Sequence, residues 1–457
     1  MPPQPHGHPH DGHSHLADLA DLDPAFDPAL RRRLTAAAVV LAVATLVGVV
    51  AVWPGSVRRA DTAAFGLPSK WFDATVTRVE RFPCPGEPGS PSATVPSAAR
   101  PSTLDGPGLC VRLSFRPAAG PDRGEVRSIE LFDIGSLPEF RRGSGIVVSY
   151  LPGALPEFRY QLADRQRTWP MVVLGLAFAV LVVVQGRLRG LAALAGLAAS
   201  IAVIVLLVLP ALVAGTSPVL VAVVASSLIA YLALYLAHGV HPLTTVALLG
   251  TLAALGLVVL LSWAFTSLTT LSGLVTEDAL YVRAFGGELN FGGLVLAGII
   301  LGALGAIDDM TVTQASAVAE LRAANPSAGY RDLYRGAIRI GRDHVASTVN
   351  TLALAYAGAS LPLLLLFVEA RQPFGRVVTS EVVATEIVRT LVGSIGLVAA
   401  VPITTLLAAR LVAGRRAVPV DAPAGVEEPT SPDDPPEAVP QDDWDAYLRQ
   451  HPEADGD

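Results

Sequence analysis

Cysteine, lysine and charged residues are scarce in this sequence. The chain of 457 residues contains two cysteines, and Lys70 is its one lysine. Charged residues account for 16% of the chain, whereas hydrophobic residues account for 51%. The sequence also lacks a Walker-type phosphate loop, a zinc-binding HExxH helix and a nucleophile elbow, so ATP hydrolysis by this chain is not expected. Outside an acidic tail the net charge is only slightly positive, and nucleic-acid binding is not expected either.

Long apolar stretches, by contrast, are abundant and recur from Leu34 onward. A transmembrane helix needs about 20 predominantly apolar residues. By that measure eight spans are expected, at residues 34–53, 169–185, 191–213, 219–237, 242–265, 290–313, 346–368 and 386–409. The first follows three arginines and ends at Trp53 without a small-residue cleavage site, so it is expected to be an uncleaved signal anchor. The predicted fold is a polytopic α-helical membrane protein, with a seven-helix domain over 169–413.

Arginines are distributed unequally between the two sides of an eight-span protein. The short segments on one side carry Arg31, Arg32, Arg33, Arg187, Arg189, Arg322, Arg331, Arg335, Arg339, Arg342, Arg410, Arg415 and Arg416. The opposite short loops hold Arg283, Arg371 and Arg376. Because cytoplasmic loops are enriched in Lys and Arg, both termini are expected in the cytoplasm and residues 54–168 outside it.

The polar segment 54–168 is expected to form a small extracytoplasmic β-domain. Apolar and polar residues alternate in WFDATVTRVE, CVRLSF, EVRSIELFD and GIVVSYL, with Gly and Pro between these runs. A five-stranded, OB-like barrel is the predicted fold. The insert 83–108 is rich in Pro, Gly and Ser, so it is expected to be a flexible loop. A disulfide between Cys84 and Cys110 is predicted at its base, because disulfides form outside the cytoplasm.

Both ends of the chain are expected to be disordered cytoplasmic tails. Residues 1–33 carry five closely spaced histidines, His6, His8, His10, His13 and His15. Neutral imidazoles at such spacing can bind Zn, Ni or Cu, although a biased tail without a physiological metal is the favoured interpretation. No other cofactor is expected. The tail 414–457 is acidic, with twelve Asp or Glu and one Arg from Asp421 to Asp457.

Two adjacent aspartates, Asp308 and Asp309, interrupt the apolar stretch LGALGAIDDMTVTQAS. At about 100° per residue, one narrow arc of a helix carries Gly298, Gly302, Gly305, Asp309, Thr313, Ser316 and Glu320. The glycines are expected to let another helix approach closely, and the rest of the arc is polar. Asp309 is therefore the predicted interior carboxylate. The alternative is that both aspartates lie in interfacial water at the cytoplasmic end of the span and only fix its position.

The segment 326–343 is expected to be a separate amphipathic helix at the cytoplasmic membrane surface, with Asn325 as its N-cap. The next span begins with buried polar residues that need hydrogen-bond partners, and bonds to the Asp309 arc are expected. These residues are Thr348, Asn350 and Thr351. The last span carries a third polar seam of Glu386, Arg389, Thr390, Gly393 and Thr404. Glu386 and Arg389, three residues apart near the outer end, are expected to pair with each other.

Two motifs resemble the YibE/F-like family of bacterial membrane proteins. They are GALGAIDDMTVTQASAVAEL at 302–321 and IGRDHVASTVNTLALAYAGASLPLLLL at 340–366, and the second is the more specific. The resemblance covers about 165–410. It implies a multi-pass protein of the bacterial cytoplasmic membrane, and it implies that Asp308 is the variable aspartate and Asp309 the better candidate for a role. The family has no established activity, so the resemblance names no substrate.

A transporter or channel-like permease is the first functional hypothesis. An ionisable group and glycines on one membrane helix suit a pathway through a bundle, with Asp309 coupling flux to a proton or another cation. The alternative is a non-catalytic assembly or regulatory protein that binds envelope partners through the outer β-domain. An intramembrane aspartyl protease is disfavoured, because Asp308 and Asp309 diverge by about 100° and cannot converge on one water. No enzymatic activity is therefore expected, and the lipid bilayer is the one partner that composition implies.

Overall fold

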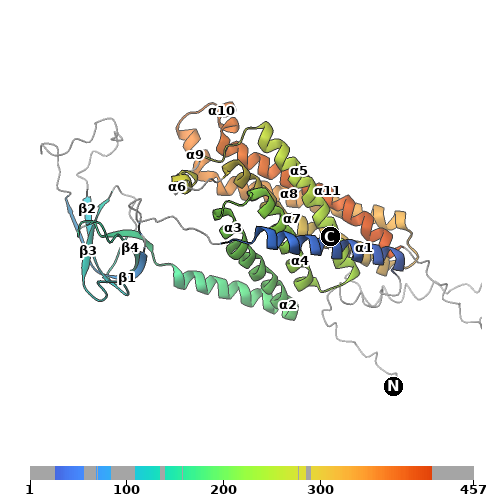
Figure 1. The fold of residues 1–457 in the computed structure, drawn as a ribbon, viewed down its shortest axis with the longest axis horizontal. Coiled ribbons are helices and arrows are strands. Elements are labelled where there is room, and N and C mark those ends of the chain that lie inside the picture. The colour runs from blue at the N-terminus through green and yellow to red at the C-terminus, as the bar shows by residue number, and fades with distance from the viewer. Residues whose placement is uncertain are drawn as a thin grey trace, which may run out of the picture. The chain divides into compact units, whose positions relative to one another are not determined.

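The computed structural model describes residues 26–55, 68, 70–83, 109–133, 139–156, 158–275, 277–284 and 290–413. These residues form a small β-domain and a helical domain (Figure 1).

The described residues of the β-domain form one antiparallel sheet of five strands, as the alternation of apolar residues predicts. The strands are β1 (Lys70–Pro83), β2 (Leu109–Pro117), β3 (Arg127–Asp133), β4 (Gly145–Tyr150) and β5 (Tyr160–Arg165), in the order β3-β2-β1-β4-β5. The first half of β1 pairs with β4 and its second half pairs with β2, with a bulge between Val76 and Arg78. Strands β3 and β5 approach each other, so the sheet curls into a half-barrel. A closed barrel is not formed among the described residues, because no hydrogen-bonded ladder joins β3 to β5.

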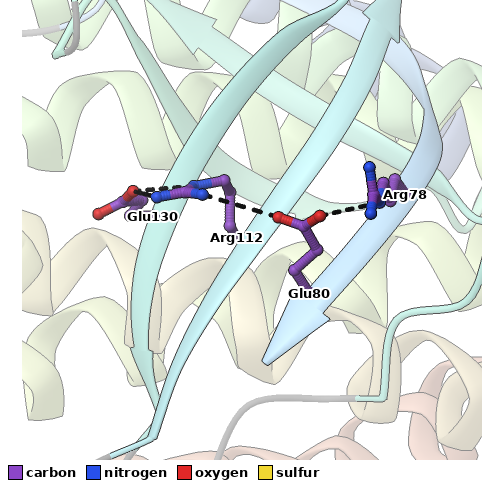
Figure 2. A network of polar contacts seen from close by, with 4 residues as sticks. All are labelled: Arg78, Glu80, Arg112 and Glu130. Atoms are coloured by element: carbon purple, nitrogen blue, oxygen red, sulfur yellow. Dashed lines mark hydrogen bonds and ion pairs between the residues drawn. The ribbon is translucent and has the colours of Figure 1, made fainter. Parts of the chain in front are cut away.

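The two faces of this sheet differ in character. Inward-facing residues of β2 and β4, such as Leu113, Phe115 and Ile146, are fully buried. On the outer face a ladder of alternating charges crosses three strands, from Arg78 to Glu80, Arg112 and Glu130 (Figure 2). Arg112 lies opposite Glu80 on one neighbouring strand and opposite Glu130 on the other. Exposed ion pairs contribute little stability, so this ladder mainly favours one register of the strands.

The helical domain contains eleven α-helices within the described residues. These are α1 (Pro28–Val52), α2 (Thr168–Val203), α3 (Leu209–Val213), α4 (Pro218–His238), α5 (Pro242–Leu268), α6 (Glu277–Ala284), α7 (Phe291–Ala324), α8 (Tyr330–Ala359), α9 (Leu361–Glu369), α10 (Phe374–Thr379) and α11 (Glu381–Val412). A short π-helix, η4 (Ile204–Val208), joins α2 to α3. Within the described residues, six helical stretches are long and apolar enough to cross a membrane, and the pair α8 and α9, bent by 59°, makes a seventh if it is one span. The predicted count of eight differs because residues 168–213, predicted as two spans, count as one helical stretch that is bent at Arg187.

That long stretch is itself sharply bent at Arg187, whose φ of 49° and ψ of −130° are not helical. Gly190 shows how tight the bend is, because a Cβ placed on it would meet the backbone carbonyl of Val182. In a straight helix, residues eight positions apart are separated by about 12 Å along the axis. The two halves of the stretch therefore fold back on each other next to Arg187, within the region where the sequence predicts a loop between two spans.

The core of the helical domain is built from α5, α7 and α11, with α4 and α8 packed around them. At one end, the amide of Asp27 before α1 donates a hydrogen bond to the carbonyl of Leu411 in α11 at 3.0 Å. The Arg410 guanidinium also lies 5.9 Å from the ring centre of Tyr330, the first residue of α8. The start of α1, the start of α8 and the end of α11 thus share one end of the domain, here called the basic end (Figure 1).

Candidate functional site

The two adjacent aspartates lie at the middle of α7, which runs unbroken from Phe291 to Ala324. A helix of 34 residues is about 51 Å long, and Asp308 is its eighteenth residue. The helix continues beyond residue 313, the predicted end of the membrane span, and includes Glu320, as the predicted arc requires. The polar residues after Met310 stay helical because Met310, Ala315, Val318 and their neighbours remain packed in the core.

The structure reverses the predicted burial of the two carboxylates. Asp308 is half-buried, and its Oδ1 atom is buried without a hydrogen-bond partner among the described residues. Asp309 is the exposed one, with 68% of its side chain accessible. Its Oδ2 lies 3.5 Å from Nε2 of His344 on α8. His344 was not among the predicted site residues, although it stands within the second family-like motif, IGRDH.

The glycines that share an arc with Asp309 do not pack against the backbone of another helix, so that prediction is wrong. A Cβ on Gly298 would lie 3.7 Å from Nη2 of Arg389, and one on Gly302 would lie 3.4 Å from the Tyr356 hydroxyl. A Cβ on Gly305 would meet nothing within 4 Å. The face of α7 formed by Gly298, Gly302, Gly305 and Asp309, here called the small-residue face, is thus met by the tips of polar side chains from α8 and α11.

Arg389 and Glu386 of α11 form the expected pair, with Nη1 of the arginine 3.1 Å from Oε1 of the glutamate. Both side chains are less than one third exposed. The guanidinium carbon lies 5.9 Å from the centre of the Tyr356 ring on α8, within the range of a cation–π contact. The small-residue face therefore has an ion pair beside Gly298 and a carboxylate–imidazole contact at Asp309, eleven positions or about 16 Å further along α7.

Close helix packing occurs instead at glycines of α5, α8 and α11. A Cβ on Gly250 would meet Thr404, one on Gly396 would meet Val258, and one on Gly341 would meet the amide of Gln314. These positions bring α5, α7, α8 and α11 together around the core. The sequence pattern did not distinguish these glycines from the others, because apolar spans contain glycine on several faces.

A buried polar layer surrounds this packing. The hydroxyls of Thr251 and Thr311 lie 2.7 Å apart, and both residues are fully buried. The Gln314 side chain, also fully buried, donates to Thr405 Oγ1 at 2.9 Å and to the Ala337 carbonyl at 3.2 Å, while its oxygen accepts from the Gly341 amide. Gln314 thus links α7 to both α8 and α11. Of this layer only Thr404, next to Thr405, was included in a predicted seam.

The predicted polar partners of Asp309 bond within their own helices. Thr313 donates to the Asp309 carbonyl, and Thr348 donates to the His344 carbonyl, both one turn back. Thr351 likewise donates to the Ser347 carbonyl, and Asn350 is exposed. The predicted bonds from Thr348 and Thr351 to the Asp309 arc are therefore wrong, because hydroxyls in a helix can use the carbonyl four residues earlier. Further along α7, Ser316 is half-buried and Glu320 is exposed.

The amphipathic segment 326–343 is not a separate helix. It belongs to α8, which begins at Tyr330 with Gly329 as N-cap and continues to Ala359. Asn325 caps the end of α7 instead. The apolar side of this segment, with Leu333, Ala337 and Gly341, is buried in the domain core, which explains its amphipathic pattern without a membrane surface.

Two further predictions involve residues outside the described part of the chain. Cys110 lies in β2 opposite Phe82, but Cys84 is outside the described residues, so the disulfide stays a prediction. The five N-terminal histidines also lie outside them. Within the described residues no group of three or more His, Cys, Asp or Glu side chains is placed to hold a metal ion.

The model of the family described as YibE/F-like protein matches residues 174–414, which is more than half of the chain. The matched region includes α7, α8 and α11, with Asp309, His344 and Arg389. No curated protein and no solved structure matches the chain.

Proposed function

The chain belongs to the YibE/F-like protein family, and we propose that it is a membrane permease whose flux is coupled to a proton or another cation through Asp309. The observation that carries this proposal is the contact of 3.5 Å between the Asp309 carboxylate and the His344 imidazole, which come from two different helices. A carboxylate and an imidazole that meet along a membrane helix are groups that can accept and donate a proton.

The exposure of Asp309 supports a hydrated path. A charged carboxylate is costly in hydrocarbon, so the small-residue face of α7 requires water or protein against it at this depth. The neighbouring Gly305 leaves this face open, because a Cβ there would meet nothing within 4 Å. The half-buried Asp308 adds a second negative charge on the adjacent residue, which favours a proton or another cation at Asp309.

The proposal is tested by proton flux in reconstituted vesicles. Under an imposed membrane potential, Asp309→Asn is expected to abolish the flux that the unmodified protein supports. The matched control is Asp343→Asn, which removes an exposed aspartate from α8 next to His344. Size-exclusion profiles check that each variant is folded. Unchanged flux in Asp309→Asn would remove Asp309 from the mechanism.

The proposed setting is the bacterial cytoplasmic membrane, with both termini in the cytoplasm and the β-domain outside. The basic end of the helical domain supports this orientation, because it collects arginines from the start of α1, the start of α8 and the end of α11. The sharp bend at Arg187 supports counting α2 as two spans, which restores the total of eight. A cysteine-accessibility map of the loops checks the orientation.

A second candidate function is partner binding by the β-domain. An open cavity of about 830 Å³ on this domain is lined by Arg78, Arg141 and Arg142, with Phe140 beside them. Such a cavity suits an acidic segment of an envelope protein. This function is tested by purifying partners with the full chain, with a chain lacking 54–168 and with Arg142→Glu. Arg116→Glu, exposed on β2 outside the cavity, is the control. Equal recovery of partners from all four chains would contradict it.

A further inference from the structure

We propose that the exposed side of α8 binds the anionic headgroups of membrane phospholipids through four arginines. The inference goes beyond the proposed permease function and uses neither Asp309 nor the β-domain. The four side chains belong to the first four turns of α8, and all of them are exposed. They are Arg331, Arg335, Arg339 and Arg342, here called the arginine row.

The arginine row lies on one side of the helix. At about 100° per residue, its members fall within an arc of about 80° and extend over about 16 Å of the helix. The opposite side of the same segment carries Leu333, Ala337 and Gly341, which are buried in the core. The row therefore points away from the protein, toward the medium that surrounds the helical domain.

The arginine row has no counter-charge within the described part of the chain. None of its side chains forms an ion pair or a hydrogen bond there, although Asp332 and Asp343 lie beside the row on the same helix. Arg335 has another arginine four residues away on each side, a spacing at which like charges destabilise a helix. An anion from outside the protein relieves this repulsion.

The row ends where the surface of α8 becomes apolar. On the same arc, Arg342 is followed by Ala346, Val349 and Ala353, and both alanines are exposed. The same change occurs in α1, where the arginines at 31–33 precede a long apolar run. Both helices start at the basic end of the domain. Two separate helices that change from charged to apolar in this way mark the boundary between headgroups and hydrocarbon.

This position favours lipid headgroups over an acidic protein segment as the anion. The apolar turns of α8 place Arg339 and Arg342 closest to the lipid phosphates, whereas Arg331 and Arg335 lie further out in water. An acidic segment docked along the row would use all four alike. A guanidinium binds a phosphate with two parallel hydrogen bonds, and each basic residue near an anionic membrane surface strengthens binding by about fivefold.

Lipid binding is measured on the purified full chain in dodecyl maltoside micelles. The midpoint of thermal unfolding is followed by tryptophan fluorescence while phosphatidylglycerol, or phosphatidylcholine with the same acyl chains, is added. A ligand that binds the folded protein raises this midpoint. We expect the anionic lipid to raise it at a lower concentration than the zwitterionic lipid does. High salt is expected to reduce this preference, because it screens exposed charges.

Two double variants with the same change of charge divide the row. Arg339→Gln with Arg342→Gln is expected to raise the concentration of phosphatidylglycerol at half-maximal stabilisation by about tenfold to thirtyfold. Arg331→Gln with Arg335→Gln is expected to raise it less. Both variants are expected to fold, because each removes repulsion between exposed arginines. Their unfolding midpoints without added lipid check this.

A third double variant controls for general charge effects. Arg371→Gln with Arg376→Gln removes two exposed arginines outside α8 and is expected to leave the response to phosphatidylglycerol unchanged.

Three results would overturn the inference. The first is an equal response of the unmodified protein to the two lipids. The second is a loss in the Arg331 and Arg335 variant that equals or exceeds the loss in the Arg339 and Arg342 variant, which indicates an acidic partner on the water side. The third is the same loss in the control variant. None of these results bears on the flux experiment with Asp309→Asn, so the two proposals fail separately.

Discussion

Gly341 is the position at which α8 crosses α7 and α11, and its replacement by alanine tests how these helices are held together. A Cβ at this position would lie 2.8 Å from Cγ1 of Val401 and would also meet the amide of Gln314. The Val401 methyl cannot retreat freely, because Val401 is itself buried in the core. Gln314 is fully buried and uses its amide to bond α8 and α11, so moving it disturbs those hydrogen bonds.

The magnitude follows from three opposing effects. Overpacking a close-packed core costs about 1–3 kcal/mol. A buried amide that loses a partner costs about 1–3 kcal/mol more. Alanine is favoured over glycine inside a helix by about 1 kcal/mol, which partly offsets both losses. Gly341→Ala is therefore expected to destabilise the helical domain by about 3 kcal/mol.

The assay is thermal unfolding of the purified full chain in detergent, followed by size-exclusion chromatography. The matched control is Gly358→Ala in the same helix, where a Cβ would meet nothing within 4 Å. The helix-propensity gain is the same in both variants, so their difference isolates the contact. We expect Gly358→Ala to unfold at or above the temperature of the unmodified protein and Gly341→Ala clearly below it. Equal unfolding temperatures of the two variants would refute the packing described for α8.

Two further predictions concern the β-domain. Burial, together with the hydrogen bond from its hydroxyl to Asp122, raises the pKa of Tyr160 to about 12. This contribution to stability is complete below the pKa of 10.0 of the unfolded state and is lost as pH rises toward 12. The free energy of unfolding is therefore expected to fall across that interval, and Tyr160→Phe is expected to lack this fall. For Cys84 and Cys110, mass spectrometry after alkylation without reductant is expected to show no labelled cysteine, and two labels after reduction. Labelling of either thiol before reduction would contradict the disulfide.

Element types were largely predictable from the sequence, because they depend on local periodicity. The alternating residues of β2, such as Leu113 and Phe115, indicate a strand with one buried face, and the described residues of the expected segment form five strands. Element ends were less predictable. Helix α8 continues from Tyr330 to Ala359 because its amphipathic side packs on the core, and the same pattern is equally compatible with a membrane surface.

The candidate site was predictable only as a list of residue types. Helical geometry separates Asp308 from Asp309 by about 100°, but it does not say which of the two directions faces the core. That choice depends on where α5 and α11 pack, and they pack so that Asp308 is half-buried and Asp309 is exposed. His344 and Arg389 join the site from α8 and α11, and no spacing within α7 indicates them.

Composition and hydropathy by themselves determined that this is a multi-pass membrane protein with one β-domain, because burial in lipid demands long apolar helices whatever their arrangement. The tertiary structure alone decided which small residues pack and which stay open. A Cβ on Gly341 would meet the Gln314 side chain, whereas a Cβ on Gly305 of the small-residue face would meet nothing within 4 Å. The two glycines differ only in which atoms of neighbouring helices lie next to them. Contacts between helices far apart in sequence depend on the shapes of both partners, which no single segment contains.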